Sequence, residues 1–471
     1  MSLLLLLLPS FSFHSFYMHL RPPPPPPLPP PPPPPEFMVN CFPQRSRKEK
    51  SATILELHHR DFCSKPISNW NKILQNHILS DQIRVKSLQS QIKSAHSNRF
   101  NHQLSQAQIP ITSGAKLETL NYIITVQLGG RNVTVIVDTG SDLTWVQCQP
   151  CGSCYTQQEP LFNPVESSSY KSVLCKSPTC NNLEDTTGSS GVCGVNSSTC
   201  NYYVTYGDGS YTRGDLATDN LVLGTTVVKG FVFGCGRAND GLFGGVSGLM
   251  GLGRSALSLI SQSYDVFNGV FSYCLPSVTD TSPGSLILGG ESETLVYKNS
   301  TPISYTTLLS NPMMSTFYFL NLTGVSIGGA SLQDPSFGKR EMLIDSGTVI
   351  SRLFPSVYNA FKSEFLKQFS NFPRASPFSI LDTCFDLSAY EEVDIPTIKL
   401  HFENEAELEV DVTGILYFVK SDASQVCLAI AGLSDEEEIG IIGNYQQKNT
   451  RVVYNTKAST LGFAREKCSS D

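Results

Sequence analysis

The sequence predicts an all-β protein of two lobes that each carry the same strand-and-turn unit. The 471 residues include 35 glycines and only 16% charged residues, and short stretches such as 317–327 and 451–463 alternate apolar with polar side chains. This composition favours strands and turns over helices. The length suffices for two lobes with a large core. One acidic turn also occurs twice, 207 positions apart, which indicates a repeated unit.

The repeated turn is Asp138-Thr139-Gly140, followed by Ser141, and Asp345-Ser346-Gly347, followed by Thr348. Each copy ends an aliphatic run, which indicates a buried strand leading into a glycine turn. Two facing carboxylates can hydrolyse a peptide bond, because the ionised group takes a proton from water and the protonated group polarises the amide carbonyl. Such a pair shares one proton and titrates as a unit. A single triplet, by contrast, is equally typical of a hairpin tip.

Further glycine-containing segments accompany the two triplets. Tyr206-Gly207-Asp208-Gly209-Ser210 lies between strand-like stretches at 201–205 and 216–223, which predicts a hairpin with a glycine tip. Such a flap could close over an extended peptide and exclude water, although the same pattern is typical of an ordinary surface hairpin. The segments 248–253 and 439–443 are aliphatic runs with glycines, and alone they indicate buried strands.

Together these motifs resemble the pepsin-like aspartic endopeptidases of family A1, in the plant branch of nepenthesin-type, nucellin-like and chloroplast-nucleoid proteases. The resemblance covers roughly residues 118 to 468. It implies a bilobal pepsin-like fold of two pseudo-symmetric, barrel-like lobes with the active site in the cleft between them. It also implies that Asp138 and Asp345 form the catalytic dyad, and that the flap contributes Tyr206, Gly207 and Asp208 to substrate binding.

The resemblance assigns supporting roles as well. Ser141 and Thr348 would bond the outer carboxylate oxygens, and the triplet residues Thr139, Gly140, Ser346 and Gly347 would support the dyad. Ser346 replaces the threonine of many animal and fungal members but keeps the hydroxyl that braces the two loops. Trp145 would hydrogen-bond the Tyr206 hydroxyl, although a buried structural indole is equally compatible with the sequence. The segments 248–253 and 439–443 would each pass beneath one dyad loop and orient it.

Charge divides the chain near residue 113. Residues 1–113 hold 12 Lys and Arg against 5 Asp and Glu, whereas the remainder holds 22 against 36, so the net charges are about +7 and −14. We expect a prosegment that covers the acidic cleft at neutral pH and leaves when carboxylates protonate, with a cut between about Arg99 and Leu117. Its helix at 78–92 would present Ile83, Leu88 and Ile92 as an apolar stripe, with Arg84 and Lys86 available to cleft carboxylates. A disordered linker is the alternative.

These observations give four expected regions. Residues 1–36 form an apolar leader with a polyproline tract, and residues 37–113 form the basic prosegment. Residues 114–298 form the N-terminal lobe with a Cys-rich insert and the flap, and residues 299–471 form the C-terminal lobe. Short helices are expected at 255–263 and 355–369 as well.

Fourteen cysteines are present, of which only Cys41 and Cys63 precede the expected lobes. The triplet Cys148-x2-Cys151-x2-Cys154 suggests a metal site, yet no histidine or second spaced pair completes one, so we expect disulfides and neither a metal nor a cofactor. We expect Cys384 to pair with Cys427 and Cys274 with Cys468. The connectivity of the rest stays open, and these cysteines are Cys148, Cys151, Cys154, Cys175, Cys180, Cys193, Cys200 and Cys235.

Targeting signals indicate the secretory pathway. Glycosylation sequons begin at Asn132, Asn196, Asn299 and Asn321, with Asn132 expected to be partly shielded. The apolar run at 3–8 indicates a weak signal peptide that is too short to span a membrane, and the 13 prolines between Pro22 and Pro35 indicate an extended spacer. We expect an apoplastic or vacuolar protein, with the chloroplast as the alternative.

The function predicted from these features is that of a monomeric aspartic endopeptidase, made as a zymogen and active on proteins or peptides in acid. The alternative is a catalytically inactive relative that binds or inhibits other proteins. Nucleic-acid binding through the basic leader is a third hypothesis. Scattered basic residues and an acidic body speak against it.

Overall fold

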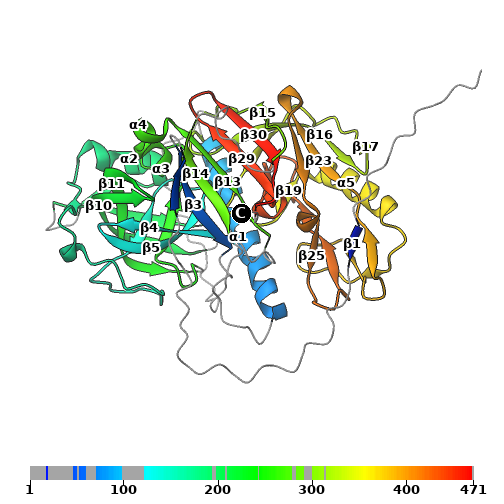
Figure 1. The fold of residues 1–471 in the computed structure, drawn as a ribbon, viewed down its shortest axis with the longest axis horizontal. Coiled ribbons are helices and arrows are strands. Elements are labelled where there is room, and N and C mark those ends of the chain that lie inside the picture. The colour runs from blue at the N-terminus through cyan, green and yellow to red at the C-terminus, as the bar shows by residue number, and fades with distance from the viewer. Residues whose placement is uncertain are drawn as a thin grey trace, which may run out of the picture.

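The structure is a computed structural model that describes residues 17–19, 46–49, 52–59, 70–97, 121–193, 198–206, 209–241, 243–277, 283–290, 300–311 and 314–468. Strands dominate it, and the prediction of a bilobal all-β fold is confirmed (Figure 1). The polyproline tract, the flap residues Gly207 and Asp208, the sequons at Asn196 and Asn299, and Cys41 and Cys63 lie outside the described residues.

The largest sheet has 16 strands and joins the two halves of the chain. In spatial order it contains β15 (Ser304–Thr307), β30 (Thr460–Arg465), β29 (Thr450–Asn455), β13 (Val270–Cys274), β14 (Gly284–Gly289), β3 (Ala52–His59), β4 (Tyr122–Leu128), β5 (Arg131–Asp138), β12 (Gly248–Gly251), β6 (Trp145–Gln147), β11 (Thr226–Asp240), β10 (Tyr211–Leu223), β9 (Cys200–Thr205) and β8 (Val192–Cys193). Two further strands join it at the side, β2 (Ser46–Glu49) on β3 and β7 (Lys171–Ser172) on β10.

The remaining strands belong to the C-terminal half. An eight-stranded sheet contains β24 (Glu407–Val410), β23 (Ile398–Phe402), β16 (Phe319–Ile327), β18 (Glu341–Ile344), β28 (Gly440–Ile442), β19 (Ser351–Leu353) and β27 (Ile430–Gly432), with β17 (Ala330–Ser331) on β16. A four-stranded sheet contains β20 (Arg374–Ala375), β21 (Cys384–Phe385), β26 (Val426–Leu428) and β25 (Leu416–Phe418). Finally, β1 (Tyr17–His19) pairs with β22 (Glu392–Asp394).

Strands from both ends of the chain meet in the middle of the molecule. The C-terminal strand β29 pairs with β13, and β3 from the expected prosegment pairs with β14 on one edge and β4 on the other. The hydroxyl groups of Tyr273 on β13 and Tyr454 on β29 lie 2.8 Å apart in a hydrogen bond. The large sheet therefore crosses the boundary near residue 298 that the sequence predicts between the lobes, and those domain boundaries stay predictions.

Within the described residues, five α-helices accompany the sheets, namely α1 (Trp70–Ser97), α2 (Pro178–Thr187), α3 (Leu259–Gln262), α4 (Tyr264–Phe267) and α5 (Pro355–Gln368). Helices occur at all three predicted places, although α1 extends beyond 78–92 at both ends and only the single turn α3 lies within 255–263. The prediction missed α2, which has a Ser177 N-cap, Pro178 in its first turn and Gly188 as a left-handed C-cap. These are ordinary start and stop signals for a helix. Of the segment predicted at 255–263, the structure has α3 at Leu259–Gln262, and α4 begins after it at Tyr264.

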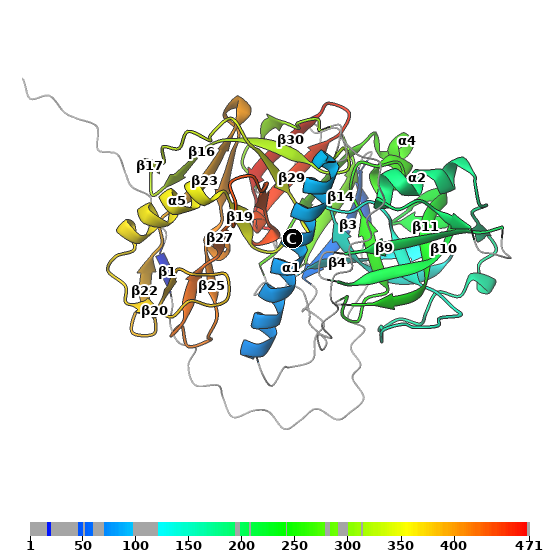
Figure 2. The ribbon, with the colours of Figure 1, turned by 180° about the vertical axis from the view of Figure 1, so that it is seen from behind.

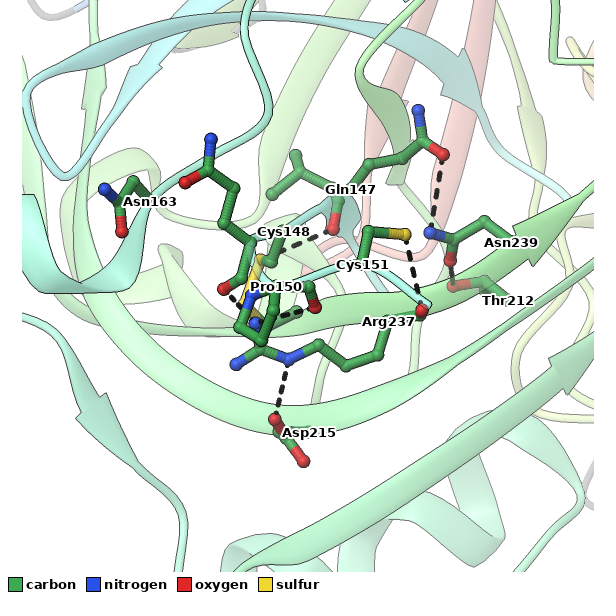
Figure 3. The surroundings of a disulfide bond; sticks show 12 residues. Gln147, Cys148, Pro150, Cys151, Asn163, Thr212, Asp215, Arg237 and Asn239 are labelled. Carbon is green, nitrogen blue, oxygen red and sulfur yellow. Dashed lines mark hydrogen bonds and ion pairs between the residues drawn. A yellow bond between two sulfur atoms is a disulfide. The ribbon is translucent and has the colours of Figure 1, made fainter. Parts of the chain in front are cut away.

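Six disulfides link the twelve cysteines between 148 and 468. They include both predicted pairs, Cys384–Cys427 and Cys274–Cys468. The connectivity that the sequence left open is Cys148–Cys235, Cys151–Cys154, Cys175–Cys193 and Cys180–Cys200. Around the first of these, Arg237 donates to Asp215 at 2.9 Å and also reaches the Gln149 carbonyl (Figure 3). The start of the cysteine-rich insert is thus held to β11 by a disulfide and a hydrogen bond, while the Arg237–Asp215 ion pair joins β11 to β10.

Two sequons lie within the described residues, and their order of preference differs from the prediction. Asn132 is exposed at the start of β5, where the sequence predicted partial shielding. Asn321 is half-buried, and its Nδ2 donates to Glu403 Oε1 at 2.9 Å. A glycan would be attached to the side-chain nitrogen. Of these two asparagines, Asn321 has that nitrogen in a hydrogen bond to a described residue and Asn132 does not.

Glycine in the strand-and-turn units is needed for close packing, which can be tested at Gly443. A Cβ atom at Gly443 would lie 2.4 Å from the Val349 carbonyl oxygen, whereas one at Gly324 would meet nothing nearer than His401 Cδ2 at 3.5 Å. We expect Gly443→Ala to lower the free energy of unfolding by about 2 kcal/mol or more, because backbone must move. Gly324→Ala should change it by less than about 1 kcal/mol. Urea unfolding of both variants checks this, and equal effects would contradict it.

Candidate active site

Two parallel strand pairs place the triplets at the centre of the molecule. Strand β5 ends at Asp138 and runs parallel to β12, while β18 ends just before Asp345 and runs parallel to β28. Just after β12, Leu252 N donates a hydrogen bond to Asp138 O at 2.8 Å. In the other half, Asp345 N donates to Ile442 O, at the end of β28, at 3.1 Å. The two aliphatic-glycine segments therefore lie beside the two loops that carry the aspartates.

The two loops are joined by a reciprocal pair of hydrogen bonds. The amide of Thr139 donates to Ser346 Oγ at 3.1 Å, and the amide of Ser346 donates to Thr139 Oγ1 at 2.9 Å. A Cβ atom at Gly347 would lie 2.4 Å from Asp138 Oδ1, so only glycine permits this approach. Serine at position 346 supplies the bracing hydroxyl that the resemblance implied.

Both aspartates are fully buried and have backbone donors. Gly140 N donates to Asp138 Oδ1 and Gly347 N to Asp345 Oδ1, each at 2.9 Å. Thr348 Oγ1 donates to Asp345 Oδ2 at 2.5 Å, in the expected role. Ser141 was expected to do the same for Asp138, but its hydroxyl makes no hydrogen bond to a described residue.

The partner that replaces Ser141 is Arg84 of α1. Its Nη1 donates to Asp138 Oδ2 at 3.2 Å, and its Nη2 lies 2.7 Å from Asp138 Oδ1. The same Nη2 lies 3.0 Å from Asp345 Oδ2, and Nε lies 3.1 Å from that oxygen. One guanidinium thus binds both aspartates.

The second expected cation, Lys86, is exposed and forms no ion pair with a described residue. Two residues along a helix turn the side chain by about 200°. Lys86 therefore points away from the side of α1 that carries Arg84, and its predicted pairing with the cleft carboxylates is wrong.

Helix α1 runs across the middle of the molecule, between its two halves (Figure 2), and reaches both aspartates through Arg84. Its buried apolar residues follow each other at intervals of three, four or seven positions. Leu74 and Ile78 pack near Val349 and Tyr417, while the C-terminal residues of the stripe pack on Met314, Phe317, Phe319 and Ile441. The stripe consists of Leu74, Ile78, Val85, Leu88 and Ile92. The predicted stripe included Ile83, which is only half-buried because it falls outside this helical spacing.

Burial controls the charges in this site. It raises the pKa of Asp345, against the attraction of Arg84, and the neighbouring Asp138 adds to the rise. Burial alone would lower the pKa of Arg84, but the attraction of Asp138 and Asp345 outweighs it and raises that pKa. The site therefore holds a permanent cation and a carboxyl group that takes up a proton more readily than ordinary aspartate.

The hairpin of β9 and β10 brings Tyr206 over the N-terminal side of the site. Its turn is closed by a bond from Tyr206 N to Ser210 O at 2.7 Å. Trp145 Nε1 donates to the Tyr206 hydroxyl at 2.7 Å, and both rings meet Phe243 edge-on. Burial raises the pKa of Tyr206 well above its usual value, so the hydroxyl keeps a proton to donate. Phe243 lies in a Gly-rich loop, and its position carried no sequence signal.

Another buried aspartate, Asp142, lies two residues beyond the first triplet. Its Oδ1 accepts from Ser255 N at 2.8 Å. Burial raises its pKa to about 7 against these hydrogen bonds, and the charge of Asp138 adds to the rise. The sequence analysis gave Asp142 no role. Its position directly after a catalytic-type triplet was the available signal.

Outside the aspartates, the described residues hold no cluster of three or more His, Cys, Asp or Glu suited to a metal ion. The three cysteines of the Cys148-x2-Cys151-x2-Cys154 motif are all in disulfides. None of the described helices combines the length and apolar character needed to cross a membrane.

Two family models match the chain, and together they span both halves of the molecule. They are described as the N-terminal and C-terminal parts of xylanase inhibitor, and they match residues 122–290 and 317–465. Among solved structures, that of edgp has a TM-score of 0.59 at 23% identity and covers 73% of this chain and 91% of its own. Basic 7S globulin from soybean has a TM-score of 0.58 at 21% identity, with 74% and 91% covered. At these identities the solved structures show the fold alone.

Sequence relatives are closer. An aspartyl protease family protein of Arabidopsis thaliana is 41% identical over 434 residues, which is 90% of this chain and 89% of the relative. Aspartic proteinase nepenthesin-1 of Nepenthes gracilis is 35% identical over 360 residues, which is 74% of this chain and 78% of the relative. With the paired triplets in two joined loops, these relatives show that the chain belongs to the pepsin-like aspartic protease family, in the plant branch that includes the nepenthesins.

Proposed function

We propose that the chain is an aspartic endopeptidase in which Asp138 and Asp345 activate water. The observation that carries this proposal is the pair of intact carboxylates on two hydrogen-bonded loops, both within about 3 Å of one nitrogen of Arg84. Carboxylates held this close share one proton, so the ionised member removes a proton from water while the protonated member polarises the scissile carbonyl. The raised pKa of Asp345 suits the group that holds this proton.

The flap has a positioning role in this mechanism. Tyr206 receives a hydrogen bond from Trp145 and keeps its own hydroxyl proton. It can therefore donate to a bound peptide while the hairpin limits the access of water.

We further propose that the protein is made as a zymogen, with α1 as the inhibitory segment. Arg84 occupies both carboxylates, so water and substrate are excluded from them. Pairing with a cation favours the ionised carboxylates, and acidification opposes it. As the pH falls through the raised pKa of Asp345, protonation removes part of the attraction that holds Arg84. The full set of disulfides supports passage through an oxidising compartment, such as the secretory pathway.

A binding or inhibitor protein remains the second candidate, because the matching family models are described as xylanase inhibitor. The two candidates differ in whether the dyad turns over a peptide. The first experiment below therefore separates them.

Replacing either dyad residue should abolish proteolysis without unfolding the protein. Asp138→Asn and Asp345→Asn each remove the shared proton with almost no change in volume, so turnover at acidic pH should fall by at least about a hundredfold. The exposed Asp265 on α4 provides a control, and Asp265→Asn should retain wild-type turnover. Hydrolysis of a quenched fluorescent peptide measures this. Absence of acid activity in the wild type itself would favour the binding protein.

Loss of the Arg84 charge should weaken autoinhibition. In the unprocessed precursor, Arg84→Met leaves two buried carboxylates without their cation, and breaking a buried pair costs several kcal/mol. We expect its initial rate at near-neutral pH to exceed that of the unchanged precursor by at least about tenfold. Lys86→Met, which alters the exposed neighbour, should not raise the rate. N-terminal mass is followed in parallel. Full activity of the uncut wild type at neutral pH would refute the zymogen.

Asp142 should make the fold less stable as the pH rises. Its folded pKa of about 7 lies above the ordinary value of 3.8, so folding takes up a proton between these values. The resulting stability is fully present below the ordinary pKa and is lost as the pH rises through about 7. Asp142→Asn keeps the Oδ1 acceptor for Ser255 and does not titrate. In an Asp345→Asn background, which prevents self-cleavage, its Tm relative to the parent should rise from pH 5 to about pH 7 and then level off. A constant difference would contradict this.

A further inference from the structure

Helix α1 buries a carboxylate next to the dyad as well as a cation. Asp81 lies three residues before Arg84, and its Oδ2 accepts from Arg352 Nη2 at 2.8 Å and from Ile350 N at 3.2 Å. Its Oδ1 accepts from Val349 N at 2.5 Å. The side chains of Asp81 and Arg352 are 0% and 3% exposed. Three donors thus converge on one carboxylate.

The three donors belong to the segment that carries the second dyad residue. Val349 and Ile350 follow the triplet almost directly, and Arg352 is the middle residue of β19. That strand is fixed on both sides, with Arg352 opposite Ala431 of β27 and Ile441 of β28. Arg352 Nη1 also donates to the Ile350 carbonyl at 2.6 Å, which sets the direction of the guanidinium. The donors therefore keep their geometry relative to Asp345 without help from α1.

If α1 left the site, the Asp81 carboxylate would leave with it. Its donors, Arg352 and the amides of Val349 and Ile350, would stay. Asp81 is the one acidic residue within ion-pair distance of Arg352 among the described residues. A guanidinium and two amides that converge on one point suit a carboxylate, because a guanidinium binds carboxylates with defined geometry and charge-assisted hydrogen bonds are strong. In the mature enzyme this position is therefore a vacant receptor for a carboxylate.

Other contacts of α1 place this receptor along the path of a substrate. The Gln89 side chain donates to Ile439 O at 2.6 Å and accepts from Ile439 N at 2.8 Å, as the backbone of a neighbouring strand would. Asp81, Arg84 and Gln89 thus occupy three successive places along the site. Three helical residues advance about 4.5 Å, against about 3.3 Å for each residue of an extended peptide. The receptor therefore lies one or two substrate residues from the scissile bond.

We infer that Arg352, with the amides of Val349 and Ile350, forms a carboxylate subsite that selects an Asp or Glu side chain near the scissile bond. The inference rests on the proposed endopeptidase activity and adds a substrate class, acidic peptides. In the precursor, Asp81 fills this subsite in place of the substrate.

Matched peptides test the subsite with acid-processed wild-type enzyme. The series has amidated C-termini and a single Gln or Glu moved through the three positions on each side of the scissile bond. One arm instead has a free C-terminal carboxylate, which distinguishes a side chain from a chain end. At one position we expect Glu to raise kcat/KM over Gln by about 10- to 100-fold, mostly through KM, because a site built for a polar group rejects ligands that lack it.

Two variants assign that preference to Arg352. In Arg352→Met the Glu-to-Gln ratio should fall to near one, while Arg374→Met, at an exposed arginine of β20, should keep the wild-type ratio. A measurement that does not depend on folding of the first variant uses wild-type enzyme. A synthetic peptide of residues 70–97 should inhibit it, and Asp81→Asn in that peptide should raise the inhibition constant by about tenfold or more.

The outcomes separate the subsite from the activity. Equal cleavage of Glu and Gln peptides at every position, or a preference confined to the free C-terminus, would overturn the acidic side-chain subsite while leaving the protease in place. A Glu preference that survives in Arg352→Met would do the same. If no peptide in the series is cleaved at any pH, the endopeptidase and the subsite fall together.

Discussion

The site depends on the two hydrogen bonds that cross between Thr139 and Ser346. Each loop gives an amide to the hydroxyl of the other, so neither carboxylate can move without straining both strands behind it. Burial of two aspartates side by side is unfavourable, because each charge loses water and repels the other. A rigid scaffold must hold them together. The parallel pairs β5 with β12 and β18 with β28 supply it, and the absence of side chains at Gly443 and Gly347 lets the backbones approach.

With α1 in place, the guanidinium of Arg84 offsets the repulsion between Asp138 and Asp345. Arg84 is 17% exposed at its side chain, so its attraction to Asp138 and Asp345 is poorly screened by water. The apolar residues of α1 bring the arginine to this place and exclude solvent around it. Charge and packing therefore support each other, since the stripe alone would leave two carboxylates unpaired and the arginine alone would remain in water.

Much of the site could be predicted from the sequence because its chemistry is local. The triplets and the flap tyrosine lie in short motifs whose residue types serve few other purposes. The arginine that contacts both aspartates, Arg84, was also among the predicted residues, from charge and helical periodicity. The wrong predictions concern side-chain directions, which depend on the three-dimensional geometry. Ile83 and Lys86 are close to Arg84 in sequence but point elsewhere, and Asp138 Oδ2 accepts from Arg84 and not from Ser141.

Features that depend on contacts between residues far apart in the sequence could not be predicted in this way. The apolar spacing of α1 runs 74, 78, 85, 88 and 92, and Asp81 occupies the place in this series where another apolar residue belongs. That interruption was a signal, yet its meaning requires Arg352, which lies 271 positions away. Phe243 and Asp142 likewise acquire their roles only when distant loops close around Trp145 and Ser255.

The place of β3 changes what release of the leader involves. Helix α1 contacts the body through side chains, whereas β3 lies inside the large sheet and pairs with β14 along six residues and with β4 along two. The helix can therefore leave without breaking any pairing between strands. If β3 left with it, β14 and β4 would each lose a neighbour, and bare strand edges attract other strands. Maturation would then be a change in sheet order at the junction of the lobes, with the mature chain or another strand required to fill the gap.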